Sequence, residues 1–270
     1  MVNVLSLFDG MSCGHLALDK AGIEVDNYYA SELDKYAIKV TQANYPDTVQ
    51  LGDVTKWREW DIDWKSIDLL IGGSPCQGFS FAGKKLAFDD PRSKLFFTYV
   101  EILNHIEDLN PDIKFMLENV KMKKEHLDVI SDYLDVEPVF INSSDFCAML
   151  RERYYWTNWD ILKHAVKPNM FQSILEKDDA RIDKAFTLTA TYYKKGGEPT
   201  RQRNFKRSQR PIAWIDDLTT RHLMPIECER LQTVPEGYTD HVSNTQRYKM
   251  LGNGWTVDVI AHIFGGLYYA

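Results

Sequence analysis

Short apolar runs alternate with amphipathic segments along the first 157 residues. The runs are short and end at Gly, Pro or acidic residues, as buried strands of a parallel sheet do. We predict strands at residues 2–7, 28–31, 48–51, 67–71, 113–117 and 136–141. Apolar residues at helical spacing between them predict helices at 15–21, 34–45, 95–109 and 127–134. This repeated order predicts an α/β fold, a doubly wound and mostly parallel sheet with helices on both faces.

The pattern changes between residue 158 and about residue 221, where helical and strand periods fade. Residues 194–211 hold seven Lys or Arg against one acid, Glu198, a local charge of +6. A solvated loop is one interpretation, but the aromatic residues interleaved at 192–214 favour a nucleic-acid partner. Helices predicted at 224–232 and 255–268 return to the main body, with a break at 252–254. We therefore predict one domain from 1–157 plus 222–270, and a small inserted region at 158–221.

The composition is that of an ordinary globular protein, 44% hydrophobic and 26% charged, with a net charge of −7. That net charge alone would discourage a nucleic-acid partner. No apolar run approaches the roughly 18 residues that span a membrane, and the N-terminus has no basic segment, so we expect a cytoplasmic protein without a membrane partner. The four cysteines, at 13, 76, 147 and 228, form no C-x-x-C pair, which argues against disulfides and against a metal site.

Cys76 is the candidate nucleophile. The predicted strand 67–71 stops at two glycines, and Ser74-Pro75 then lead into the cysteine. Open α/β sheets bind their ligands at the carboxyl ends of such strands. A lone cysteine is more often a small buried residue. The Gly- and Ser-rich flanks favour an exposed loop instead.

A nucleotide-type site is predicted at the first strand-to-helix turn, residues 8–14. The G-x-G-x-x-G fingerprint is absent, which argues against a pyrophosphate cradle. Glu32, after the second strand, suits a ribose diol, and Asp53 could accept from an adenine amino group. Either acid alone is more often a helix cap.

Three further residues carry candidate chemistry. Glu118 follows the predicted strand 113–117, where a carboxylate in an apolar setting could handle protons. A cap on the next helix is the alternative interpretation. Arg151 and Arg153 are two residues apart, so on a strand they share one face.

Taken together, these segments resemble the carbon-5 cytosine-specific DNA methyltransferases over nearly the whole chain and in the family's order. The first loop and the tail at 238–255 are most similar to the branch containing the vertebrate de novo enzymes. Two positions depart from the pattern: Ser12 stands where the family usually has a second glycine, and Met149 where it commonly has Gln. The matching segments are Phe8-Asp9-Gly10, Glu32, Gly52-Asp53-Val54, Ser74-Pro75-Cys76-Gln77, Glu118-Asn119-Val120, Arg151-Glu152-Arg153, Glu229-Arg230-Leu231-Gln232 and Leu251-Gly252-Asn253.

The resemblance implies the S-adenosylmethionine-dependent methyltransferase fold, with 158–221 as the target-recognition region. It implies methyl transfer to a flipped-out cytosine of double-stranded DNA through a covalent Cys76 adduct. Glu118 would hold the ring near N3, and Arg151 and Arg153 would position the base and a nearby phosphate. Which base removes the carbon-5 proton stays open. The residues assigned to S-adenosyl-L-methionine are Phe8, Asp9, Gly10, Met11, Ser12, Cys13, Glu32, Asp53, Val54, Asn253 and Trp255. Those assigned to DNA are Ser80, Lys84, Thr187, Leu188, Arg201, Arg203, Lys206 and Arg207.

Other functions remain as alternatives. A relative of this family methylates cytosine in transfer RNA, but its Cys-Phe-Thr tripeptide does not occur here. A non-catalytic regulator on the same fold could discard the nucleophile, whereas Cys76, Glu118 and Arg151 are retained. An NAD-type oxidoreductase lacks its phosphate fingerprint. The oligomeric state, monomer or homodimer, and the presence of a companion restriction nuclease stay open.

Overall fold

The computed structural model describes residues 1–74, 94–194 and 196–269, so the assignments to Cys76, Ser80 and Lys84 lie outside the described residues. Its main feature is a seven-stranded sheet in the order β3-β2-β1-β4-β5-β7-β6. The strands β1 to β5 pair in parallel, while β7 runs antiparallel to both of its neighbours. The prediction of a mostly parallel sheet is therefore confirmed. The strands are β1 (Val2–Leu7), β2 (Val25–Ser31), β3 (Val49–Gln50), β4 (Leu69–Gly72), β5 (Lys114–Val120), β6 (Val139–Asn142) and β7 (Glu152–Thr157).

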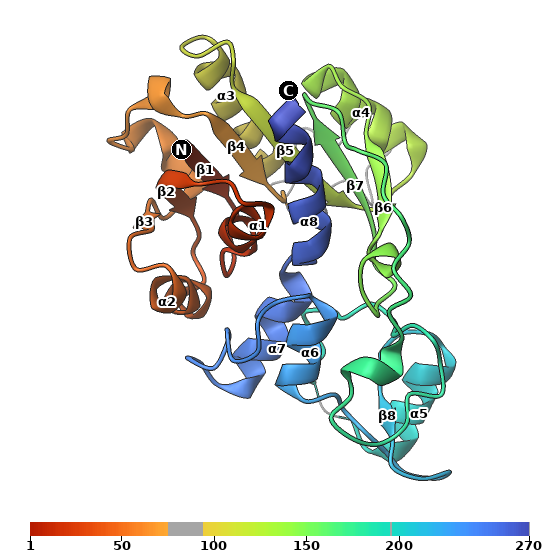
Figure 1. The fold of residues 1–270 in the computed structure, drawn as a ribbon. Coiled ribbons are helices and arrows are strands. Elements are labelled where there is room, and N and C mark those ends of the chain that lie inside the picture. Colours follow the sequence, from red (N-terminus) through yellow and green to blue (C-terminus); the bar gives the residue numbers. More distant parts are fainter. Residues whose placement is uncertain (75–93, 195, 270) are drawn as a thin grey trace.

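Helices cover both faces of this sheet because alternate strand residues point to opposite sides. Val4, Ile71 and Met116 join one apolar core with α1 (Cys13–Ala21), α2 (Lys35–Asn44) and α8 (Val257–Phe264). Leu5 and Leu70 join the other with α3 (Lys94–Glu107) and α4 (Lys124–Leu134). Figure 1 shows α1 and α8 side by side on one face. Each face is thus buried, as a doubly wound sheet requires.

The chain reverses direction within the sheet between β1 and β4. From β1 it proceeds outward through β2 and β3, and then returns to place β4 on the other side of β1. The loops that follow β1 and β4 therefore diverge. Open α/β sheets bind their ligands in the crevice that forms at such a switch point.

The predicted strands and helices are present, with shifted ends. The predicted strand 48–51 is reduced to β3. β5 continues through Glu118 to Val120 because those residues pair with β7.

Among the described residues, two α-helices were missed, α5 (Glu198–Lys206) in the basic stretch and α7 (Asn244–Asn253) before the break at 252–254. The remaining elements are β8 (Ala213–Trp214), β9 (Thr220–Arg221), α6 (Pro225–Leu231) and the 3-10 helices η1 (Val54–Glu59), η2 (Trp64–Ser66), η4 (Ser143–Asp145), η5 (Phe171–Ile174) and η6 (Gly265–Tyr269).

The small region at 158–221 holds α5 and the β8-β9 pair, below the sheet in Figure 1, with α6 and α7 at the junction. Its apolar residues belong to the same core as α1 and α8. Tyr192 stands against Tyr248 of α7, with ring centroids 5.5 Å apart. The Tyr192 hydroxyl accepts from the Leu223 N–H and donates to the Pro211 carbonyl, both at 2.8 Å. This region is packed onto the main body through α6 and α7.

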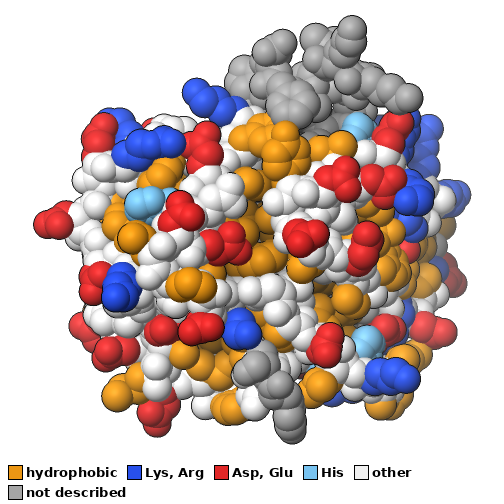
Figure 2. Space-filling model, turned by 90° about the horizontal axis from the view of Figure 1, so that it is seen from above, with side chains coloured by type: hydrophobic (Ala, Val, Ile, Leu, Met, Phe, Trp, Pro, Cys, Tyr) orange, Lys and Arg blue, Asp and Glu red, His pale blue; other side chains and the backbone are white. Residues whose placement is uncertain are grey.

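The surface seen in Figure 2, from above the view of Figure 1, mixes acidic and basic side chains over its described part without a continuous basic area. The described part of that face lacks the continuous positive charge of a DNA-binding surface. Among the described residues, no helix is both long and apolar enough to span a membrane.

Candidate active site

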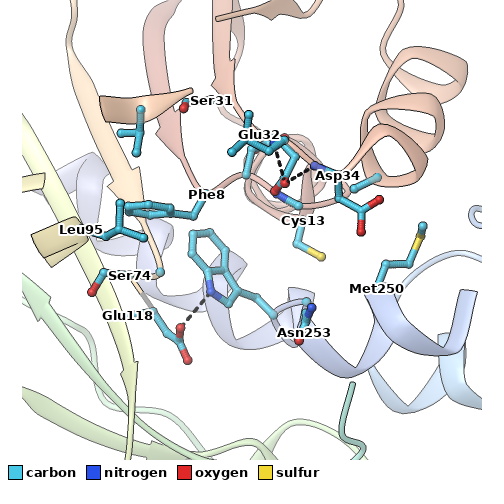
Figure 3. A pocket seen from close by; sticks show the side chains of 18 of the residues that line it. Phe8, Cys13, Ser31, Glu32, Asp34, Ser74, Leu95, Glu118, Met250 and Asn253 are labelled. Atoms are coloured by element: carbon cyan, nitrogen blue, oxygen red, sulfur yellow. Dashed lines mark hydrogen bonds between the residues drawn. The ribbon is translucent and has the colours of Figure 1, made fainter. Parts of the chain in front are cut away.

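A cavity of about 530 Å³ opens at the carboxyl ends of β1, β2, β4 and β5, at the switch point of the sheet. Figure 3 shows side chains from the β1 loop, the end of β2, the end of β5 and α7 converging on it. The predicted nucleotide-type residues and the predicted proton-handling Glu118 line this same cavity. Those of the sequence-predicted residues that line it are Phe8, Asp9, Gly10, Cys13, Glu32, Asp53, Val54, Glu118, Arg151, Arg153, Asn253 and Trp255.

Asp9 organises the loop that follows β1. Its carboxylate accepts from the hydroxyls of Ser6, Ser12 and Tyr28, at 2.6 Å from Ser6 and 2.8 Å from Tyr28. Burial raises the pKa of Asp9 to about 6, against the opposing effect of these hydrogen bonds. Ser12 has φ of 59°, in the left-handed region that favours glycine. The hydrogen bond to Asp9 offsets that strain and explains how serine stands where the family has glycine.

Glu32 fastens the end of β2 to this loop. One carboxylate oxygen accepts from the Gly10 N–H at 2.8 Å, and the other accepts from the Leu33 and Asp34 N–H groups at 2.7 Å each (Figure 3). A carboxylate has about four acceptor positions, so capacity remains for a ligand hydroxyl. Glu32 therefore faces the cavity with its position fixed by backbone donors.

Asp53 combines a place in the cavity wall with the role of a helix cap. It lines the cavity, and it also caps η1, since one of its oxygens accepts from the Thr55 N–H at 2.9 Å and from the Thr55 hydroxyl. These hydrogen bonds lower the pKa of Asp53. The carboxylate is thus ionised at neutral pH and keeps acceptor capacity toward the cavity.

Glu118 occupies the end of β5 and is only 8% exposed. One carboxylate oxygen lies 2.7 Å from the Nε atom of Arg153, and the other accepts from the Trp255 indole N–H at 3.1 Å (Figure 3). Arg153 reaches it because β7 runs antiparallel beside β5, with Arg153 opposite Val120. Both oxygens of this nearly buried carboxylate are therefore engaged at the cavity wall, one in an ion pair with Arg153 and the other in the hydrogen bond from Trp255.

Arg151 has a different position from the one we predicted. It is 4% exposed, and its guanidinium donates to the carbonyls of Leu188 at 3.1 Å and Gly254 at 2.9 Å, with longer contacts to Gly252. Burial, with the charge of Arg153 adding to it, lowers the pKa of Arg151 to about 10, so it stays charged at neutral pH. Because its donors are spent on backbone carbonyls, Arg151 joins chain segments and does not reach out to a phosphate.

The chain enters the segment that contains Cys76 from beside Glu118. Asn119 donates its side-chain amide to the carbonyl and hydroxyl of Ser74, at 3.3 Å each. The other three cysteines are buried. Burial raises the pKa of Cys13 to about 12 and that of Cys147 to about 11, and it also raises the pKa of Cys228. These thiols stay protonated at neutral pH and are poor nucleophiles.

Four other assignments made from the sequence do not match the geometry. Met11 and Ser12 belong to the β1 loop but are buried and do not line the cavity; the Met11 carbonyl accepts from the Tyr238 hydroxyl. The Leu188 side chain is fully buried, so it cannot touch DNA. Arg201 pairs with Glu198 and also donates to the Thr220 hydroxyl and the Gly196 carbonyl. Its donors are engaged within the small region, and we no longer assign it to a phosphate.

The remaining assigned residues of the small region are accessible. Arg203, Lys206 and Arg207 are exposed on α5 and just after it. Thr187 is half-buried, and its hydroxyl donates to the Leu150 carbonyl. These four stay candidates for DNA contact.

Sequence reasoning missed several residues that line the cavity. Leu33 and Asp34 follow Glu32 directly, a proximity that could have identified them. Of the α7 residues in the cavity wall, Asn253 was assigned from the sequence, whereas Met250 and Gly252 were not, because that helix was not predicted. Lys249 of α7 pairs at 2.6 Å with Asp34, which lines the cavity and caps α2, and so joins α7 to the start of α2. The missed residues are Ser31, Leu33, Asp34, Ala37, Gly52, Gly73, Ser74, Leu95, Asn119, Val120, Met250, Gly252 and Gly254.

Comparison of the sequence with known protein families identifies the family of this chain. Residues 2–136 and 148–268 match the C-5 cytosine-specific DNA methylase family, and the chain belongs to that family. It is therefore a DNA cytosine-5 methyltransferase. It is 31% identical to the type II methyltransferase M1.ScrFI of Lactococcus lactis subsp. cremoris, over 95% of this chain and 75% of that one. It is 28% identical to the type II methyltransferase M.HhaI of Haemophilus parahaemolyticus, over 96% and 92%.

Solved structures extend the fold similarity. The Entamoeba histolytica methyltransferase EhMeth superposes with a TM-score of 0.76 at 17% identity, over 100% of this chain and 98% of that one. DNMT2 of Spodoptera frugiperda gives 0.71 at 20% identity, over 99% and 100%. At these identities the likeness shows the fold alone. None of these relatives decides the branch of the family, so the likeness to the vertebrate de novo enzymes stays a prediction.

Proposed function

We propose that the enzyme transfers the methyl group of S-adenosyl-L-methionine to a cytosine flipped out of duplex DNA, through a covalent adduct of Cys76. The observation that carries the proposal is the single cavity in which Glu32 and Glu118 occupy different walls. One wall offers a carboxylate for a ribose, and the other offers a carboxylate and a guanidinium for a base. Two ligands that must exchange a methyl group would thus bind side by side.

The cofactor assignment rests on the chemistry of the donor set. Glu32 and Asp53 provide acceptors at the ends of β2 and β3, and Phe8, Val54 and Leu95 provide apolar walls for an adenine ring. The cavity volume is ample for a ligand of that size. When bound, S-adenosyl-L-methionine supplies an electrophilic methyl group on a sulfonium. Glu32 would accept from the ribose hydroxyls and Asp53 from the adenine amino group.

The base assignment follows from the low nucleophilicity of carbon 5 of cytosine. It is too weak a nucleophile to take a methyl group unaided, so the Cys76 thiolate would add to carbon 6 and move electron density onto carbon 5. Glu118 and Arg153 would hold the pyrimidine edge where charge develops. After methylation, removal of the carbon-5 proton restores the ring double bond and releases the thiolate. A stacked cytosine cannot reach these groups, so the base must be flipped.

The direct test is transfer of tritiated methyl from S-adenosylmethionine to duplex DNA and, separately, to transfer RNA. We expect incorporation into duplex DNA at carbon 5 of cytosine. Incorporation into transfer RNA with none into duplex DNA would replace the DNA assignment by the RNA alternative. Absence of transfer to either, with a correctly folded protein, would favour the non-catalytic regulator.

Glu32→Ala is expected to weaken S-adenosylmethionine binding by roughly tenfold to a hundredfold, since lost charged hydrogen bonds cost about 1.5–3 kcal/mol. DNA affinity should change much less. Isothermal titration calorimetry measures both, and Glu32→Gln, which keeps the side-chain shape, reports the contribution of the charge. Glu59→Ala, an exposed acid at the end of η1, is the matched control. Unchanged cofactor affinity in both Glu32 variants would remove the ribose assignment.

The double substitution Arg203→Ala/Lys206→Ala is expected to weaken binding to target and scrambled duplexes alike. Each phosphate contact adds roughly −0.9 to the slope of log affinity against log salt, so the slope should flatten by about two units. A salt series of DNA affinities measures it. Lys56→Ala/Lys65→Ala removes the same charge from exposed positions in η1 and η2 and should leave the slope unchanged. If the α5 pair also leaves it unchanged, the DNA lies elsewhere.

A further inference from the structure

Trp255 contacts the proposed base site and the proposed cofactor site at once. Its indole N–H donates to the Glu118 carboxylate at 3.1 Å, and the residue lines the cavity beside the β1 loop. The packing there is close. A β-carbon on Gly73 would lie 2.9 Å from the Glu118 oxygen and 3.0 Å from the indole nitrogen, so only glycine fits between the loop and this pair.

The backbone before Trp255 is held by side chains from two other elements. The Gly254 carbonyl accepts from Arg151 at 2.9 Å and from Gln232 at 3.1 Å, and Gln232 also bonds the Leu251 carbonyl at 2.6 Å. The indole is therefore attached to a rigid turn between α7 and α8. A hydrogen bond from such a donor fixes the direction of its acceptor.

We propose that Trp255 is a positioning residue that sets the orientation of Glu118 for the cytosine edge, an inference that rests on the proposed function. A carboxylate held at one oxygen alone can rotate about its terminal bond. With Arg153 on one oxygen and the indole N–H on the other, Glu118 presents its remaining lone pairs in a fixed plane. Fixed geometry of this kind raises the rate of a bound substrate's reaction more than it raises substrate affinity.

The same contact joins the two halves of the cavity. The indole lies beside Gly14 and the Trp255 backbone hydrogen-bonds the Cys13 thiol, so the position of Trp255 depends on how the cofactor side is packed. Glu118 thereby receives its orientation from a residue on the cofactor side. This assigns Trp255 a role beyond that of an apolar surface for S-adenosylmethionine.

The test is Trp255→Phe, which keeps an aromatic wall and removes the N–H donor. We expect kcat to fall about tenfold to a hundredfold, while KM for S-adenosylmethionine changes by less than about threefold. Trp255→Leu serves as a second variant should the first fold poorly, and melting temperatures check both. Trp60→Phe is the matched control, because the Trp60 indole does not line the cavity, and it should leave both constants unchanged.

A double-mutant cycle with Glu118→Gln separates positioning from packing. If Trp255 acts through Glu118, adding Trp255→Phe to Glu118→Gln should cause little further loss of kcat. Multiplicative losses, an unchanged kcat in Trp255→Phe, or a rise confined to KM for S-adenosylmethionine would each overturn the inference. A wild-type protein that transfers no methyl group would instead overturn the proposed function.

Discussion

Cys76→Ala should abolish methyl transfer, lowering turnover by about a thousandfold or more, because the other thiol among the described residues of the cavity, Cys13, stays protonated at neutral pH. The melting temperature and the affinity for S-adenosylmethionine should stay close to those of the wild type. Tritium incorporation into duplex DNA measures turnover. Cys147→Ala is the matched control, since that thiol is buried outside the cavity and should not affect turnover beyond its effect on stability.

The covalent mechanism also predicts that a complex of the enzyme with DNA can be trapped. Fluorine at carbon 5 of cytosine cannot leave as a proton, so duplex DNA containing 5-fluorocytosine should accumulate as a covalent adduct with the wild type and not with Cys76→Ala. A denaturing gel shows the adduct. Appreciable turnover in purified Cys76→Ala, or no adduct under conditions of normal turnover, would rule out the covalent mechanism.

Gly252→Ala is expected to destabilise the protein by roughly 3 kcal/mol and to lower its melting temperature by about 6–10 °C. A β-carbon there would lie 2.2 Å from the carbonyl carbon of Thr189 and 2.4 Å from the nitrogen of Ala190. Backbone atoms cannot move away as a flexible side chain can. Activity should fall as well, because Gly252 stands beside Arg151 and in the cavity wall.

Thermal unfolding followed by circular dichroism measures this effect. Gly265→Ala provides the control, since a β-carbon on Gly265 meets nothing within 4 Å and its φ is −56°. That variant should be neutral or slightly stabilising. Equal melting temperatures for the two variants would mean that residues 188–190 pack more loosely against α7 than the geometry indicates.

The elements that were predicted correctly can be recognised from patterns of neighbouring residues. The strand 2–7 and the helix 95–109 are recognisable because burial on both faces, or on one helical face, leaves a periodic apolar pattern. Glu32 and Glu118 were identifiable because strand ends in parallel sheets converge on one edge. These inferences need only neighbouring residues and a general rule of topology.

The parts that the sequence did not predict depend on distant contacts. α7 is polar along most of its length and is helical because Tyr248, Met250 and Leu251 are buried by other elements. Arg151 was assigned, with Arg153, to position the base and a nearby phosphate. The sequence does not show that the carbonyls at positions 188, 252 and 254 surround the Arg151 guanidinium. Leu188 was assigned to DNA contact, yet packing turns its side chain into the core. Such outcomes follow from tertiary structure alone.

The joint around Arg151 has a consequence for how target specificity can change. Arg151 bonds the carbonyl of Leu188, and Gly252 packs on the backbone of Thr189 and Ala190, so both contacts at the joint use main-chain atoms of residues 188–190. Main-chain atoms are the same whatever the side chains are. On the proposal that residues 158–221 recognise the target, a region of different sequence could be grafted here, provided that its segment corresponding to residues 188–190 keeps the same backbone course. The catalytic part of the molecule would need no compensating substitution at this joint. The joint is therefore a suitable junction for engineering enzymes with new target sites.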